Sequence, residues 1–187
     1  MSMLWKGVPI PVLVAILLLI VGGLIHIVGL ATPYWHSVTI TNSVIQNKPY
    51  GHQGLWAICS SRGTDVVDCN SHGDTKSVLI ATRALEVLAL LFGAACIIIT
   101  GLWFFLHIER YRLILMISCL GTGFIAGLFG FIGIIIYAAD VNSNSRITDV
   151  TSVYVQTLDW SFALCVVSSI MVTVATILIG IGTRMMK

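Results

Sequence analysis

Four long apolar segments limit this chain to very few folds. They cover residues 8–31, 78–106, 113–139 and 160–182. As helices rising ~1.5 Å per residue, each is long enough to cross the ~30 Å hydrocarbon core of a bilayer. Only 10% of the 187 residues are charged, whereas a soluble domain carries about 25%. Because a spanning segment must satisfy its own backbone hydrogen bonds, we expect a single membrane domain with four helices in an antiparallel bundle.

The polar connections between the segments predict how the chain is oriented. Six aspartates and four basic residues lie in the two long loops, 32–77 and 140–159. The short turn and the two ends of the chain carry Lys6, Arg110, Arg112, Arg184 and Lys187. Basic residues collect on the cytoplasmic side, so we expect cytoplasmic termini, external long loops and a plasma-membrane location. The first segment is too long for a signal peptide and lacks small-residue cleavage chemistry, so we expect it to be retained.

Small residues on the third segment predict a close helix contact. Gly123 and Gly127 have the spacing G-x-x-x-G, and Ala126, Gly130 and Gly133 extend the same small face. Helices in lipid associate through the close backbone approach that such residues permit. Packing within the bundle is the favoured interpretation, and an interface between protomers is the alternative. The segment is also longer than a bilayer requires, so we expect it to tilt or to project beyond the headgroups.

The first long loop has the composition of a small β-sheet. Its strand-favouring stretches are residues 34–41, 54–59 and 66–69, and its turn-favouring stretches are residues 47–51 and 60–64. We therefore expect three or four antiparallel strands that end in a hairpin. In the second loop, residues 150–156 are rich in β-branched side chains and are expected to add an edge strand.

The cysteines divide into two groups. Cys96, Cys119 and Cys165 lie inside apolar segments, where a free thiol behaves as a small apolar group. Cys59 and Cys69 lie outside them, in the compartment we expect to be oxidising, and should form a disulfide. Closing a loop of about 11 residues stabilises a fold by roughly 3 kcal/mol. A metal site is the rival interpretation, but these two have no His or Cys partners at ligand spacing, so we expect no metal.

Trp35 and Trp56 have two interpretations. Tryptophans collect at the headgroup level in any membrane protein, and this explanation is strong for Trp35, directly after the first segment. It is weaker for Trp56, which lies far from either membrane entry. The alternative is that both side chains wedge the sheet onto the helix ends.

Few ionisable residues lie inside the segments, and each is a functional candidate by default. Arg83 and Glu86 stand three apart on one helix face, and His26 is in the first segment. We favour a structural role, in which Arg83 pairs with Glu86 or bonds to loop carbonyls, over ion binding or conduction. There is no recognisable catalytic set or phosphate-binding glycine loop, so we expect neither enzyme activity nor a cofactor. A net charge of +2 without a basic run argues against nucleic-acid binding.

The order Trp35, Gly54-Leu55-Trp56, Cys59, Cys69 resembles a known signature. It is similar to the W…GLW…C…C pattern of the claudin, peripheral myelin protein and epithelial membrane protein superfamily. The 21-residue step between the tryptophans, the ten-residue step between the cysteines and residues 81–85, including Arg83, resemble claudins. Residues 52–56 and 160–162 resemble the lens fibre and epithelial members more closely.

The resemblance implies a four-helix bundle with an outer sheet of about five strands, four from the first loop and one from the second. It also implies self-association in the membrane plane and contact between cells, with paracellular sealing by the first loop in true claudins. A junctional or adhesive protein surrounded by membrane lipids is therefore the first functional hypothesis, and its acidic loops should disfavour anions. The alternative is an auxiliary, gamma-type subunit of an ion channel or receptor. Residues 183–187 do not match the carboxyl-terminal scaffold-binding motif of typical claudins.

Overall fold

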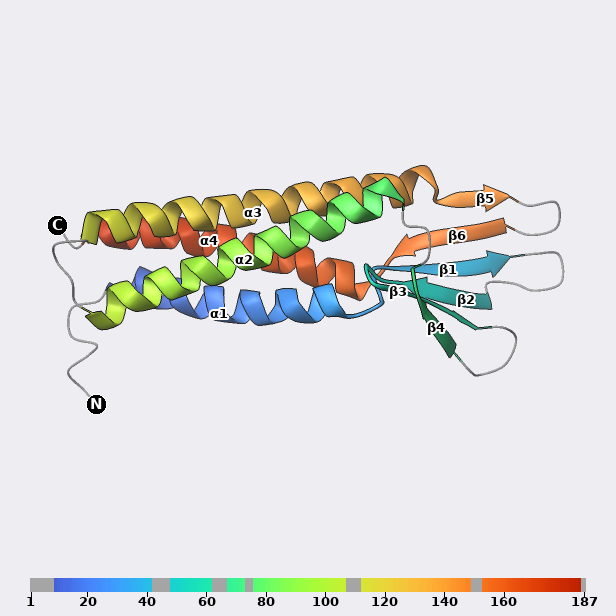
Figure 1. Cartoon of the computed structure of the whole chain (residues 1–187), viewed down its shortest axis with the longest axis horizontal. Coiled ribbons are helices and arrows are strands. Elements are labelled where there is room, and N and C mark those ends of the chain that lie inside the picture. Colours follow the sequence, from blue (N-terminus) through green and yellow to red (C-terminus); the bar gives the residue numbers. More distant parts are fainter. Residues whose placement is uncertain are drawn as a thin grey trace.

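The computed structural model describes residues 9–41, 48–61, 67–72, 76–106, 112–148 and 153–185. Four helices form a bundle, and a sheet extends from one end of it (Figure 1). The helices are α1 Ile10–Ala31, α2 Ser77–Leu106, α3 Arg112–Ser143 and α4 Trp160–Met185. Each is long and apolar enough to cross a membrane.

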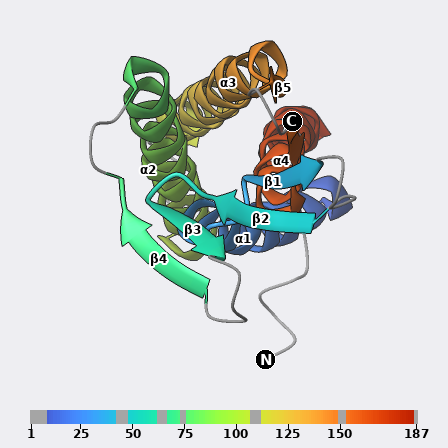
Figure 2. The same cartoon turned by 90° about the vertical axis from the view of Figure 1, so that its right-hand side faces the viewer.

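The helices run alternately toward and away from the sheet, so that α1 begins and α4 ends at the opposite end of the bundle (Figure 1). The closest neighbours are α2 with α3, α1 with α4, and α3 with α4, whereas α1 and α2 touch over a shorter length. Viewed from the sheet end, the four helices surround a common interior (Figure 2).

The third helix continues to Ser143, beyond the apolar segment expected to end at residue 139. Its last turn is closed by polar side chains, since Ser143 Oγ and Asn144 Nδ2 each donate to the carbonyl oxygen of Asp140 at 2.8 Å. These bonds satisfy carbonyls that a helix end otherwise leaves open. The extra turn carries α3 toward the sheet.

The six strands of the described residues form one antiparallel sheet in the order β4-β3-β2-β1-β6-β5. The strands are β1 His36–Thr41, β2 Lys48–Gln53, β3 Ala57–Ser61, β4 Val67–Ser71, β5 Arg146–Thr148 and β6 Val153–Leu158. Pairing of β1 with β6 joins the two loops, with His36 opposite Leu158 and Thr41 opposite Val153.

The turn predicted at residues 47–51 is wrong, because most of this stretch belongs to β2. Its turn-favouring residues are accommodated by an irregularity in the pairing with β1, where the register shifts next to Thr39 and Pro49 lies opposite. Proline, which has no N–H to donate, is tolerated at such a site. Only glycine fits at position 51 of β2, because a Cβ there would collide with the carbonyl oxygen of Cys59 on β3.

The second loop contributes two strands rather than the single edge strand expected. The strand β6 lies inside the sheet, between β1 and the short strand β5. Residues 149–152, where the predicted strand began, lie outside the described residues.

The glycine face of α3 packs against α4 of the same chain. A Cβ on Gly127 would lie 2.6 Å from Thr173 Oγ1, and one on Gly130 would lie 2.5 Å from Ser169 Oγ. Gly123 meets Thr176 in the same way. The missing side chains let the two backbones approach closely, which is the intramolecular packing that the sequence favoured.

Candidate functional site

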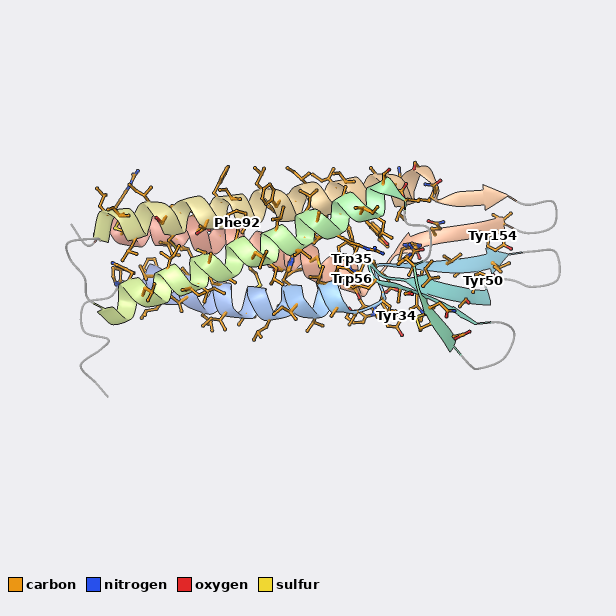
Figure 3. All side chains as sticks on the ribbon, viewed as in Figure 1. Tyr34, Trp35, Tyr50, Trp56, Phe92 and Tyr154 are labelled. Atoms are coloured by element: carbon orange, nitrogen blue, oxygen red, sulfur yellow. A yellow bond between two sulfur atoms is a disulfide. The ribbon has the colours of Figure 1, made fainter. Side chains whose placement is uncertain are left out.

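Trp35 joins the sheet to three of the helices. Its side chain is completely buried, and its Nε1 donates to the carbonyl oxygen of Gly29 in the last turn of α1 at 2.8 Å. The indole ring lies edge-on to Tyr137 of α3 and Phe162 of α4, with ring centroids 4.9 Å and 5.9 Å away. Figure 3 shows Trp35 and Trp56 where the helices meet the sheet. A residue between α1 and β1 therefore fixes the sheet to the bundle.

The Gly54-Leu55-Trp56 segment makes the tight connection between β2 and β3. A Cβ on Gly54 would collide with Pro33 and lie 2.9 Å from the Thr32 carbonyl oxygen, so only glycine fits here. The next residue, Leu55, is fully buried. Nε1 of Trp56 donates to the Leu30 carbonyl oxygen at 2.9 Å.

The two tryptophans thus satisfy adjacent carbonyls at the end of α1, which have no partner within the helix. Their burial is the opposite of what the sequence favoured, which was a headgroup location for Trp35 rather than for Trp56. Trp35, beside the membrane entry, is enclosed by aromatic rings, whereas the ring of Trp56 is 45% exposed.

Arg83 links α2 to the same segment. Its Nε donates to the Leu55 carbonyl oxygen at 2.7 Å, and its guanidinium lies over the Trp56 ring, 5.3 Å from the centroid. Among the described residues it forms no ion pair with Glu86, so the predicted pair is wrong and the alternative, a bond to a loop carbonyl, is confirmed. The two side chains diverge because Arg83 reaches up to the sheet while Glu86, almost one turn deeper, is fully buried in the bundle. We call Trp35, Gly54, Leu55, Trp56 and Arg83 the sheet–helix junction.

The disulfide between Cys59 and Cys69 is present and cross-links the outermost hairpin. The two cysteines lie directly opposite each other on β3 and β4. The bond faces the inner part of the sheet at Cys59, which is buried, while Cys69 is exposed. It therefore ties the edge strand to a strand that adjoins the junction.

Comparison with family models tests the resemblance. The model of the PMP-22/EMP/MP20/Claudin family matches residues 10–181. The chain belongs to the PMP-22/EMP/MP20/Claudin family. It is accordingly a multi-pass membrane protein with four transmembrane helices and the claudin-like fold of a helical bundle with a disulfide-linked sheet. A comparison with curated proteins finds no match.

This claudin-family chain also holds a buried polar cluster that spacing along the sequence does not reveal. His26 of α1, Glu86 of α2 and Cys165 of α4 place one ligand-type atom each within 4.8 Å of one another. His26 Nε2 lies 3.2 Å from the backbone carbonyl oxygen of Glu86 and 3.5 Å from its Oε2. His26 and Glu86 can each be recognised in the sequence as an intramembrane polar residue, but no spacing relates them. Only the packing of α1, α2 and α4 brings Cys165 to them.

A second group of His52, Cys59 and Cys69 is equally close. Its two sulfurs are committed to the disulfide, so it is not a metal site. The imidazole of His52 instead stacks on Tyr34, with ring centroids 4.1 Å apart.

Proposed function

We propose that this chain is a claudin-like protein of cell–cell contacts, which assembles with copies of itself and adheres or seals the intercellular space through its sheet. The observation that carries this proposal is a continuous sheet, built from both loops and fixed to the bundle by the sheet–helix junction. The ends of the sheet, β4 and β5, pair on one side only within the described residues. An edge strand offers a row of free backbone N–H and C=O groups to another chain.

The strand β4 is the stronger candidate for such pairing. Its residues 68–71 are all exposed, and the disulfide holds it in extended register against β3. Asp68 and Asn70 place polar side chains along this edge. A second copy can therefore add to the edge without first unfolding any other element.

We further propose that the sheet faces the outside and that both termini are cytoplasmic. The basic residues of the termini and the short turn support this orientation. The disulfide supports it independently, because it requires an oxidising compartment on the sheet side. With six aspartates against four basic residues in the long loops, the protein should discriminate against anions in the space it lines.

The test is expression of the full chain in non-adherent cells that lack junctions, followed by imaging of tagged protein at touching and free membrane. We expect enrichment at contacts and, in an epithelial layer, a change in transepithelial conductance. Asn70→Lys should reduce enrichment because a second charged side chain on β4, in addition to Asp68, would disfavour the addition of another strand at this edge. Asn142→Lys is the matched control, since Asn142 is also exposed but lies at the end of α3, away from β4.

Uniform surface staining together with unchanged conductance would refute the proposal. Affinity purification from native membrane distinguishes this function from the alternative of an auxiliary subunit. Recovery of self-copies supports assembly at contacts, whereas a stoichiometric large partner would identify an auxiliary subunit of a channel or receptor.

A further inference from the structure

We propose that His26, Glu86 and Cys165 bind a divalent transition-metal ion of the Zn²⁺ class inside the bundle. Their imidazole nitrogen, carboxylate oxygen and sulfur all lie within 4.8 Å of one another. Metal–ligand bonds of about 2.0–2.3 Å would place tetrahedral ligand atoms ~3.3–3.7 Å apart. The three side chains would therefore have to move closer together by about 1 Å to bind the ion. The site is independent of the role proposed for the sheet.

The buried carboxylate of Glu86 is an independent indication that a cation binds at this position. Its side chain is 0% exposed, and neither carboxylate oxygen has a hydrogen-bond partner among the described residues. A buried polar group without a partner is strongly unfavourable. His26 Nε2, at 3.5 Å from Oε2, is too far for a good hydrogen bond. A cation between the two side chains would satisfy both.

Charge and ligand chemistry together select the ion. A divalent cation bound to one carboxylate, one thiolate and a neutral imidazole forms a complex with no net charge, which a low-dielectric interior tolerates far better than a lone carboxylate. Nitrogen and sulfur ligands disfavour Mg²⁺ and Ca²⁺ and suit Zn²⁺. Binding would release the Cys165 proton together with any proton held by Glu86, and His26 would bind as the tautomer protonated on Nδ1. Three protein ligands leave a fourth position open.

The surrounding helices leave room at the carboxylate. A Cβ on Gly133 of α3 would lie 2.7 Å from Glu86 Oε1, so this glycine makes the space that the side chain occupies. All four helices therefore shape the site. The site lies close to the sheet. Arg83 contacts the sheet, and Glu86 is three residues farther along α2, which corresponds to ~4.5 Å along the helix axis.

A partly polar cavity lies at the sheet end, beyond the proposed site. This cavity of about 170 Å³ lies between the sheet and the ends of α2 and α3, and Lys76, Asp140 and Tyr137 are among its lining residues. Tyr137 is one turn above Gly133 on α3.

The experiment uses the full chain in detergent micelles, stripped with a chelator and titrated with Co²⁺ as a spectroscopic substitute for Zn²⁺. We expect one Co²⁺ per chain, a thiolate-to-cobalt charge-transfer band and displacement of that band by Zn²⁺. Cys165→Ser should abolish the band, and Glu86→Gln should weaken binding by at least about tenfold, as loss of a direct ligand exceeds loss of an outer partner. Cys96→Ser is the matched control, because it removes a buried thiol elsewhere in the bundle.

A wild-type chain without the band would overturn the proposal. A band that survives Cys165→Ser, or that Cys96→Ser removes, would overturn it by placing the metal elsewhere. A second measurement needs no variant. Bound Zn²⁺ should slow alkylation of Cys165 on heating relative to that of Cys96, as read by peptide mass spectrometry, and equal slowing of both would contradict the site.

Discussion

Replacement of Arg83 tests the sheet–helix junction most directly, because one side chain makes two separate contacts there. Its Nε donates to the carbonyl oxygen of Leu55 at 2.7 Å, and its guanidinium lies 5.3 Å from the centroid of Trp56. Arg83→Met keeps a long, flexible side chain of similar reach but removes both interactions. Arg83→Lys keeps the charge and can still lie over the ring, but it loses the planar Nε donor.

The magnitude follows from the two contacts. A hydrogen bond from a charged donor contributes about 1.5–3 kcal/mol, and a partly exposed cation–π contact adds ~0.5–1 kcal/mol. Arg83→Met should therefore lower the free energy of unfolding by about 2–4 kcal/mol, and Arg83→Lys by roughly half as much. In a double-mutant cycle with Trp56→Leu, the coupling energy should be about 0.5–1 kcal/mol, which is the cation–π part alone.

Equilibrium unfolding in mixed micelles of a mild detergent and sodium dodecyl sulfate, followed by tryptophan fluorescence, measures these free energies. Two of the five tryptophans, Trp35 and Trp56, lie in the junction, so the signal includes a contribution from it, and Trp35 keeps that contribution in the Trp56→Leu variants. An Arg83→Met protein within about 0.5 kcal/mol of wild type would be no different from an ordinary surface substitution. That result would refute the claim that Arg83 fastens the sheet to α2, whereas zero coupling to Trp56 would refute the cation–π contribution alone.

Three further predictions concern the disulfide, the glycine face and a buried histidine. Cys59→Ser should lower stability by roughly 3 kcal/mol and retain the protein in the secretory pathway, as measured by surface biotinylation. Gly130→Ala should destabilise by about 1–3 kcal/mol, because its Cβ would lie 2.5 Å from a hydroxyl of α4. Burial lowers the pKa of His36 from 6.5 to about 4. Below about pH 6.5 the unfolded chain therefore binds a proton that the folded chain does not, so the free energy of unfolding should fall by about 3 kcal/mol between about pH 6.5 and 4.

Each of these has a matched control. Cys96→Ser should reach the surface normally, and normal delivery of Cys59→Ser would contradict the role of the disulfide. Gly121→Ala should be neutral or slightly stabilising, since a Cβ at Gly121 would meet no atom within 4 Å; equal losses at the two glycines would disprove the packing argument. His36→Gln should flatten the pH dependence, and an unchanged slope would assign it to other groups.

The helices could be predicted from the sequence because a spanning segment must be apolar along its whole length and must satisfy its backbone hydrogen bonds internally. The disulfide was readable because only Cys59 and Cys69 lie outside such segments. The β2 strand was missed because Pro49 and Gly51 favour turns locally, whereas pairing with β1 and β3 on either side decides their conformation. The local turn preference is overridden when pairing with neighbouring strands satisfies the backbone hydrogen bonds.

The sequence by itself therefore determined the four membrane-spanning segments and the cross-linked hairpin, which follow from composition and from the placement of the cysteines. The family came from a resemblance of residues to a known signature, which the family model confirmed. Only the tertiary structure decided which tryptophan is enclosed, that Arg83 bonds to Leu55 rather than to Glu86, and that His26, Glu86 and Cys165 meet. The physical reason is that burial and polar partners depend on how separate helices pack. Those contacts join residues that are far apart in the chain. Arg83 and Leu55 are 28 positions apart, and His26 and Glu86 are 60 positions apart.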